Sequence, residues 1–202
     1  MESPGSIYDA MHKYTKALST ALGCRDLMTR LHSDRVRDLS EAIGIRFGLG
    51  KEQLSALRLS SSFHDVGKIG TPDHILLKTT TFDADEWEIM KQHSELGERI
   101  IRSTEMEGAE LAAKVIRHHH EHYDGGGYPD GLAGEAIPIC SRIISIADSY
   151  DAMAVTRSYH RARGHREIMD ILHEETGRKH DPQLMPLFRK IIEDSPLKAA
   201  EA

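Results

Sequence analysis

The chain has 202 residues, of which 39% are hydrophobic and 29% are charged, a composition typical of soluble globular proteins with a sizeable core. Its net charge of -6 argues against binding of long nucleic acid, although a local positive charge such as a metal ion would still permit a small anionic substrate. No apolar run approaches the roughly 20 residues that a membrane helix needs, and no signal-peptide pattern opens the chain. We therefore expect a cytoplasmic protein without a membrane segment.

Apolar residues recur every three to four positions along most of the chain, which predicts amphipathic helices. The pattern covers residues 7–22, 36–47, 54–63, 87–100, 111–115 and 139–150, with shorter stretches near 165–175 and 183–193. Asp83 and Glu86 predict the N-terminal cap of one helix, and we interpret Trp87 as part of the core. Because no strand alternation or internal repeat is visible, we predict an all-α, single-domain helical bundle.

A glycine-rich stretch from Asp124 to Pro138 interrupts the helical pattern. Its glycines and prolines exclude regular structure, and loops of this length are often functional. The two cysteines, Cys24 and Cys140, are too few for a disulfide framework, so we expect both to be reduced and buried.

The 13 histidines are more than folding requires, and several recur with acidic residues at regular intervals. His32, His64 with Asp65, His93, the run His118–His120 and Asp148 each fall on a separate predicted helix. The gaps of about 25–32 residues correspond to one helix plus one connection. Antiparallel helices could therefore point these side chains at one interior spot, as in bundles that hold two metals.

Each of these residues also has an ordinary explanation. Taken singly, His32 or His93 on an apolar helix face is more often a hydrogen-bonded core residue. Asp148 is harder to explain, because a carboxylate rarely lies within a run such as RIISIADSYDAM without a cation or another partner. Adjacent histidines in the His118–His120 run project about 100° apart, so they cannot all reach one site. Their joint occurrence favours a metal centre.

Five segments resemble the HD-GYP domain in order and spacing, from about Arg25 to Phe188. They are HSDRV, HDVGKIGTPDHILLK, HSELG, HHEHYDGGGYPDGLAGEAIP and RIISIADSYDAM. HDxGK alone would indicate only the broad HD phosphohydrolases, whereas HHExxDGxGYP is far more specific. The resemblance implies a helical bundle of the HD-domain type with a long ordered GYP loop. It also implies a metal centre held by His32, His64, Asp65, His93, His119, His120 and Asp148, with Asp65 bridging the metals.

The resemblance further implies the identity and number of the metals. Some members of the family hold a third metal through a glutamate one helical turn before the first histidine. Here that position is Met28, whose thioether is a poor ligand for hard divalent cations. We therefore expect two divalent ions, with iron favoured by the resemblance and manganese next. The ligand types alone fit iron, manganese and zinc about equally.

The activity implied by the resemblance is hydrolysis of cyclic di-GMP to pGpG, with onward cleavage to GMP left open. A metal-activated hydroxide would attack the phosphodiester at the binuclear centre. Asp65 and Lys68 are the expected catalytic residues. The ammonium of Lys68 could hold a phosphate oxygen or protonate the leaving 3′-oxygen, and the alternative is an ordinary surface lysine.

By resemblance, the substrate also contacts Tyr128, Arg157 and the position of His160, where the family usually has lysine or arginine. Arg157 suits bidentate binding of phosphate or a guanine edge. Tyr128 could equally be a packing residue of the loop.

The remaining residues of the loop motif have supporting roles in this interpretation. Asp124 is expected to brace the loop or a ligand histidine, and Glu121 to play a similar part. Gly127 and Pro129 are expected to shape the loop, because glycine lets the backbone turn sharply near a ligand.

Two other functions remain open from the sequence. One is a module that senses cyclic di-GMP or docks a diguanylate cyclase domain without turnover, and the other is a hydrolase of a related cyclic dinucleotide. We expect an N-terminal helix over residues 1–22 that would join an upstream sensor domain, the catalytic domain over 23–195, and a tail over 196–202.

Overall fold

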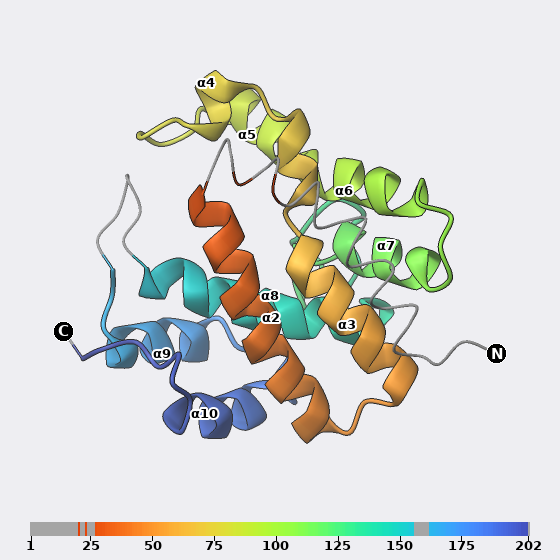
Figure 1. Cartoon of the computed structure of the whole chain (residues 1–202). Coiled ribbons are helices and arrows are strands. Elements are labelled where there is room, and N and C mark those ends of the chain that lie inside the picture. Colours follow the sequence, from red (N-terminus) through yellow and green to blue (C-terminus); the bar gives the residue numbers. More distant parts are fainter. Residues whose placement is uncertain (1–19, 21–22, 24–26, 156–161, 202) are drawn as a thin grey trace.

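The structure is a computed structural model of the whole chain, and it describes residues 20, 23, 27–155 and 162–201 (Figure 1). Most of the expected helix over residues 1–22 lies outside the described residues, as do Arg157 and His160. The side chain of Met28 is likewise outside the description.

The described residues form an all-α fold, as predicted, with one isolated bridge between Thr176 and His180. The α-helices are α2 (Leu27–Phe47), α3 (Lys51–Phe63), α4 (Asp73–Leu76), α5 (Ala84–Lys91), α6 (His93–Arg102), α7 (Ala109–Arg117), α8 (Ile139–Ala154), α9 (His165–Glu174) and α10 (Met185–Glu193). Two 3₁₀ turns, η1 (Val66–Gly70) and η2 (Gly134–Ala136), lie within the connections. Figure 1 shows α9 and α10 on one side of α2 and α8, with α6 and α7 on the other.

Two clusters of buried apolar side chains hold the helices together. The larger one joins α2, α8, α9 and α10 and includes the fully buried Tyr150 and Phe188. The smaller one joins α3, α6 and α7 around Phe63 and Ile116. Both α3 and α7 contribute to the two clusters, because Leu57 and Val115 belong to the larger one. Burial of each large apolar side chain stabilises the fold by about 1.5–3 kcal/mol.

The predicted cap at Asp83 is present, but the helix that follows it ends earlier than the periodicity suggested. The carboxylate of Asp83 accepts a hydrogen bond from the backbone N–H of Glu86, and the carboxylate of Glu86 accepts one from the backbone N–H of Asp83. The helix breaks at Gln92, so that His93 begins a new helix rather than lying inside the first. The Nδ1 atom of His93 donates a hydrogen bond to the carbonyl of Met90. Met90 lies in the last turn of α5, where helix carbonyls need donor partners from outside the helix ladder.

Several other predicted positions differ in the same way. His64 caps the end of α3, Asp65 precedes η1, and the histidine run follows α7 instead of continuing it. The interpretation of Trp87 as a core residue is wrong, since its side chain is 44% exposed. The chemistry-bearing residues therefore lie mostly at helix ends and not on helix faces.

The glycine at position 67 sets the distance between two of these helix ends. A Cβ on Gly67 would lie 1.9 Å from the carbonyl oxygen of His93 and 2.6 Å from the amide nitrogen of Gly97. Only glycine permits this approach of η1 to α6. The backbone after His64 and Asp65 is thereby pressed directly against the start of the helix that carries His93.

Candidate metal centre

Seven side chains converge where α2, α3, α6 and α8 meet the segment after α7. They are His32, His64, Asp65, His93, His119, His120 and Asp148. Six of them form two groups of three whose ligand atoms lie within 4.8 Å of one another: His93, His119 and His120, and His32, His64 and Asp148. The ring centroids of His64 and His119, one from each group, are 5.2 Å apart. The structure therefore brings together all seven residues predicted as ligands.

The carboxylate of Asp65 lies between the two groups. Its Oδ2 atom is 3.5 Å from Nε2 of His64, and its Oδ1 atom is 3.6 Å from Nε2 of His93. One oxygen thus faces each group, which is the arrangement that a carboxylate needs to bridge two cations.

His64, His93 and His119 are all oriented by the same backbone contact. In each ring, Nδ1 donates to the carbonyl three residues earlier in the chain. The acceptors are Ser61 at 2.8 Å, Met90 at 2.7 Å and Ile116 at 2.6 Å. Because a carbonyl can only accept, the proton stays on Nδ1, and Nε2 keeps the lone pair that a metal needs.

The Nε2 atoms of these three histidines test whether the site fits a metal. All three are buried and have no hydrogen-bond partner within the described part of the chain. Leaving such an atom unsatisfied costs about 1–3 kcal/mol, so three of them close together fit a site for metal ions. The ends of α3, α5 and α7 also bring partial negative charge to this point, which favours a cation. The residues therefore fit a metal site.

The protonation states of the buried rings agree with metal binding. Burial lowers the pKa of His93 to about 4 and that of His119 to about 3. The pKa of His120 is also lowered by burial. At neutral pH these rings are neutral and have lone pairs available for an ion.

The two carboxylates are ionised in spite of their burial. For Asp65, burial opposes ionisation, but the ammonium of Lys68 and the neighbouring imidazoles hold its pKa well below the usual value. Lys68 donates directly to Asp65, with Nζ 2.7 Å from Oδ2. For Asp148, burial is likewise outweighed, here by the hydrogen bond from His32, so its pKa is also well below the usual value.

His32 is held by the predicted ligand Asp148 and by Asp151, which the sequence analysis missed. Its Nδ1 atom lies 2.7 Å from Oδ2 of Asp151, and its Nε2 atom lies 2.9 Å from Oδ1 of Asp148. Arg35 donates two hydrogen bonds to Asp151, at 2.6 and 2.9 Å. Asp151 follows Asp148 by three positions in α8, so the two carboxylates share a helix face. That spacing could have revealed it.

The glycine-rich loop is fixed by Glu121. The buried carboxylate of Glu121 accepts from the backbone N–H of Asp130 at 2.7 Å and from that of Leu132 at 3.1 Å. Gly127 allows the loop to fold back closely, because a Cβ there would lie 2.2 Å from the amide nitrogen of His122. Glu121 therefore supports the loop and does not reach the seven converging side chains through these contacts.

Asp124 also braces the loop. Its Oδ1 atom accepts from the N–H of Gly126 at 2.9 Å, and its own N–H donates to the carbonyl of Arg178 at 2.8 Å. The side chain is exposed. Of the two roles expected for Asp124, the contacts correspond to loop bracing and not to orientation of a ligand histidine.

Tyr128 lies against the centre. Its ring stacks on the imidazole of His120, with centroids 4.9 Å apart, and its backbone N–H donates to the carbonyl of His120 at 3.2 Å. The Tyr128–Pro129 peptide bond is cis. Burial raises the pKa of the Tyr128 phenol, so the hydroxyl is protonated at neutral pH.

A third group, His118, Glu121 and Asp130, also has ligand atoms within 4.8 Å of one another. Its members already have partners. Asp130 accepts from Arg117 at 2.6 and 2.7 Å and lies 2.8 Å from Nε2 of His118. This group is therefore an ion-pair network that ties the loop to the end of α7.

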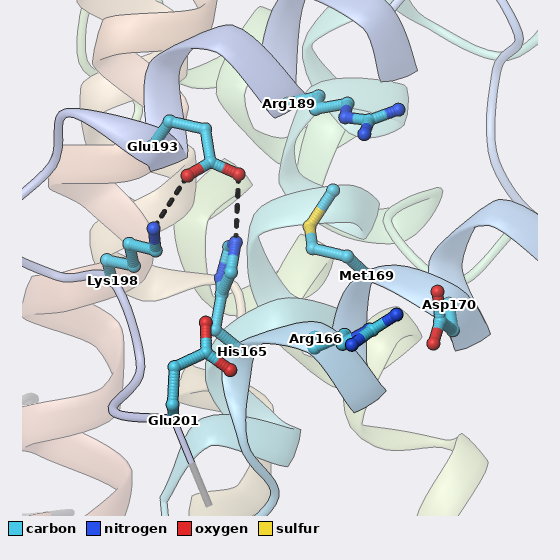
Figure 2. Close-up of a pocket in the computed structure, with 8 residues that line it drawn as sticks. All are labelled: His165, Arg166, Met169, Asp170, Arg189, Glu193, Lys198 and Glu201. Atoms are coloured by element: carbon cyan, nitrogen blue, oxygen red, sulfur yellow. Dashed lines mark hydrogen bonds and ion pairs between the residues drawn. The ribbon is translucent and has the colours of Figure 1, made fainter.

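A hollow of about 430 Å³ lies elsewhere, between α9, α10 and the C-terminal segment (Figure 2). None of the seven converging side chains lines it. Its walls are internally paired in part, since Glu193 accepts from Lys198 at 2.6 Å and contacts His165 at 3.1 Å. The same segment is docked on the core, where the N–H of Ala199 donates to the Tyr150 hydroxyl at 2.9 Å.

A profile of the HD domain matches residues 15–184, most of the chain. The chain therefore belongs to the HD domain family, and its motifs identify the HD-GYP branch of that family. The "Cyclic di-GMP phosphodiesterase" of Thermotoga maritima is 34% identical to it over 91% of this chain and 50% of its own length. The "3'3'-cGAMP-specific phosphodiesterase 2" of Vibrio cholerae is 36% identical over 85% of this chain and 33% of its own length.

Among solved structures, a cyclic GMP-AMP specific phosphodiesterase of V. cholerae has a TM-score of 0.71. It is 21% identical, and the match covers 95% of this chain and 50% of that one, which supports the fold. The chain spans about half the length, or less, of the curated relatives it matches. No helix among the described residues is both long enough and apolar enough to cross a bilayer.

Proposed function

We propose that the chain is a metal-dependent phosphodiesterase that hydrolyses cyclic di-GMP to pGpG, with onward cleavage to GMP left open. The observation that carries this proposal is the pair of three-residue ligand groups with the carboxylate of Asp65 between them. The names of the relatives give independent support, since the T. maritima protein is named for this activity.

The centre would hold two divalent ions. We assign one to His93, His119 and His120, the other to His32, His64 and Asp148, and Asp65 to both. Five imidazoles and two carboxylates suit iron, manganese or zinc, and the HD-GYP likeness favours iron first and manganese next. When bound, such a pair lowers the pKa of water and neutralises charge on a phosphodiester.

The charge of the centre would favour an anionic substrate although the whole chain is acidic. Two divalent ions would outweigh the carboxylates of Asp65 and Asp148, because an imidazole binds a metal in its neutral form. Lys68 adds a further positive charge beside them. A local positive field of this kind attracts phosphate oxygens in spite of the net charge of -6.

Lys68 is the residue that we assign to the leaving group. Its Nζ atom is only partly buried, with 18% of the side chain exposed, and it lies against Asp65 at the edge of the centre. From there Nζ would hold a phosphate oxygen or give a proton to the leaving 3′-oxygen. Tyr128 is assigned to substrate binding on its contact with His120. Arg157 and His160, outside the described residues, are assigned on the likeness alone.

A related cyclic dinucleotide is the second candidate substrate. The specific observation that favours it is the 36% identity to a V. cholerae protein named as specific for 3'3'-cGAMP. A sensor or docking module without turnover is disfavoured, because all seven ligand positions hold a histidine or an aspartate, whereas a non-catalytic member would be expected to have lost some of them.

The test is an assay of protein purified without oxygen and loaded with Fe²⁺ or Mn²⁺. Cyclic di-GMP, 3'3'-cGAMP and a nucleoside monophosphate are incubated in parallel, and the products are separated by chromatography. We expect cyclic di-GMP to be opened to pGpG, and the Asp65→Ala variant to lose metal and turnover together. Tight binding without any product would support the sensor instead, and turnover by metal-free Asp65→Ala protein would refute the mechanism.

We further propose residues 23–195 as the catalytic domain and residues 1–22 as a helix leading from an upstream sensor domain, with 196–202 as a tail. The partial coverage of the relatives supports additional domains in such proteins. A diguanylate cyclase domain is a candidate partner of the GYP loop. The buried thiol of Cys140, which forms no disulfide, agrees with a cytoplasmic location.

A further inference from the structure

A row of aromatic rings leads outward from the metal-centre residue His120. The ring of Tyr128 stacks on His120, with an angle of 29° between the planes. Trp87 meets Tyr128 edge-on, with centroids 6.0 Å apart. Phe82 stacks on Trp87 in turn, at 6.3 Å and 24°. The row connects the wall of the proposed centre with the surface of α5.

The packing of the helices does not explain why Trp87 is exposed. Its side chain is 44% exposed, and Met90 is the one residue of α5 that is buried. A single exposed apolar side chain is common and means little by itself. The exposure of Trp87 is different, because its ring is in contact with Tyr128, which stacks on His120 of the centre.

Two sets of contacts fix the start of the helix that carries Trp87. The capping box of Asp83 and Glu86 fixes the start of α5, and Lys78 forms an ion pair with Glu86 from the preceding segment. On this helix the Trp87 ring is contacted by Phe82 and Tyr128, and a ring held in a defined orientation binds a flat ligand at a lower entropic cost.

A positive charge accompanies the aromatic row. Nζ of Lys91, which pairs with the exposed Glu88 at 2.7 Å, lies 5.8 Å from the centroid of the Tyr128 ring, and Nζ of Lys68 lies beside Asp65 of the centre. A ligand that combines anionic groups with flat rings suits this surface. In a cyclic dinucleotide each phosphate is one sugar away from a purine, so a phosphate at the centre leaves a base within reach of the surrounding wall.

We propose that Trp87, with Phe82 stacked on it and Tyr128 beside it, is the platform on which a purine base of the cyclic dinucleotide stacks. This inference rests on the proposed function and adds a specificity element to it. Stacking of a base on an aromatic side chain strengthens binding by roughly 5- to 150-fold, and every base has a face that can stack. Trp87 would therefore favour purine dinucleotides over small phosphodiesters without distinguishing guanine from adenine.

The first experiment uses the fact that Trp87 is the only tryptophan of the chain. A non-hydrolysable phosphorothioate analogue of cyclic di-GMP is titrated into the metal-loaded protein while the indole emission is recorded. We expect saturable quenching with a midpoint equal to the inhibition constant of the same analogue. Inorganic phosphate, which has no base, should bind the centre without quenching.

The second experiment compares the kinetics of three variants. Trp87→Leu should raise KM for cyclic di-GMP about tenfold or more, whereas Trp87→Phe should raise it less than about threefold, because phenylalanine still stacks. Leu77→Ala is the matched control, since Leu77 is an exposed apolar residue, at 55%, that does not belong to the row. Inorganic phosphate, which has no flat ring, should inhibit all three variants as strongly as it inhibits the wild type.

The outcomes separate this inference from the proposed function. An unchanged KM in Trp87→Leu, or binding of the analogue with unchanged emission, would overturn the stacking platform while turnover of cyclic di-GMP left the function intact. If the wild-type protein neither bound nor hydrolysed a cyclic dinucleotide, the proposed function and the platform would both fail.

Discussion

Nδ1 of His32 lies 2.7 Å from Oδ2 of Asp151, although 119 positions separate the two residues in the chain. The contact joins α2 to α8 at the edge of the proposed metal centre. Arg35 donates two hydrogen bonds to the same carboxylate. Asp151 therefore fixes the orientation of the proposed ligand His32. Hydrogen-bond partners of metal ligands often affect metal affinity strongly.

The first prediction is that Asp151→Asn weakens metal binding. The amide keeps the shape of the side chain but removes the charge that orients and polarises the His32 ring. We expect metal affinity to fall about 10- to 100-fold, measured by competition with a chelator of known affinity. Asp38→Asn, at an exposed position of α2, should bind metal like the wild type. Equal affinities for the two variants would show that Asp151 has no such role.

The second prediction concerns the two ligand groups. His119→Ala removes a member of one group, and His32→Ala removes a member of the other. We expect each variant to retain about one of two ions per chain, and Asp65→Ala to weaken both, because its oxygens face both groups. Metal analysis after gel filtration gives the stoichiometry. Full retention of two ions by all three variants would contradict the assignment.

The third prediction is that Glu121→Gln loosens the loop without emptying the centre. The amide nitrogen of glutamine would face one of the two backbone N–H groups that the carboxylate now accepts. We expect the free energy of unfolding to fall by about 1–3 kcal/mol and KM to rise, with unchanged metal content. Urea unfolding and metal analysis measure these. Glu107→Gln, on the exposed surface, is the control, and loss of metal in Glu121→Gln would count against a role confined to the loop.

The fourth prediction is that Gly67→Ala is not tolerated. The added methyl would overlap the carbonyl of His93, a backbone atom that cannot move aside without shifting α6. We expect a loss of about 3 kcal/mol or more, or no soluble protein. Gly50→Ala should cost at most about 1 kcal/mol, because Gly50 has an ordinary φ of -68° and an open environment. A Gly67→Ala variant as stable as Gly50→Ala would rule out the tight contact.

The fifth prediction concerns the metal-free chain at low pH. His93 and His119 have folded-state pKa values of about 4 and about 3, below the value of 6.5 of an exposed histidine. Between pH 6.5 and 4 the unfolded state therefore binds more protons, and stability falls as the pH falls, by about 1.4 kcal/mol per pH unit for each group. His32, whose pKa is raised by its contacts with Asp148 and Asp151 despite burial, offsets part of this loss.

Chelator-treated protein unfolded in urea at pH 7.5, 6.5 and 5.5 measures this effect. The midpoint should change little between the first two values and then decrease toward the third. A midpoint that rises on acidification would mean that these rings are protonated in the folded chain.

The sequence was sufficient to predict the all-α class, the cap at Asp83 and the meeting of the seven residues. Helical periodicity and the spacing of histidines and acids are properties of the chain itself. The choice of His119 and His120 from the histidine run came from the resemblance to the HD-GYP domain. The sequence placed His93 inside a helix and not at its start, because the apolar periodicity continues past Gln92, where α5 and α6 are separated. Trp87 was misassigned because it continues the apolar pattern that includes the buried Met90, although its own side chain is exposed.

The three-residue spacing from Asp148 could have pointed to Asp151, but its pairing with His32 could not be predicted from local sequence. It depends on the contact between α2 and α8, which are far apart in the chain. The role of Glu121 was closer to hand, because a carboxylate next to a glycine-rich loop has many backbone N–H groups to accept from.

His64, His93 and His119 are each aimed by a main-chain carbonyl at the end of a helix. Every amino acid offers the same carbonyl, so the side chains at positions 61, 90 and 116 can be exchanged without turning the rings. Related chains could therefore differ in much of the sequence of the bundle and keep the same cluster of imidazoles, provided that each helix ends at the same position.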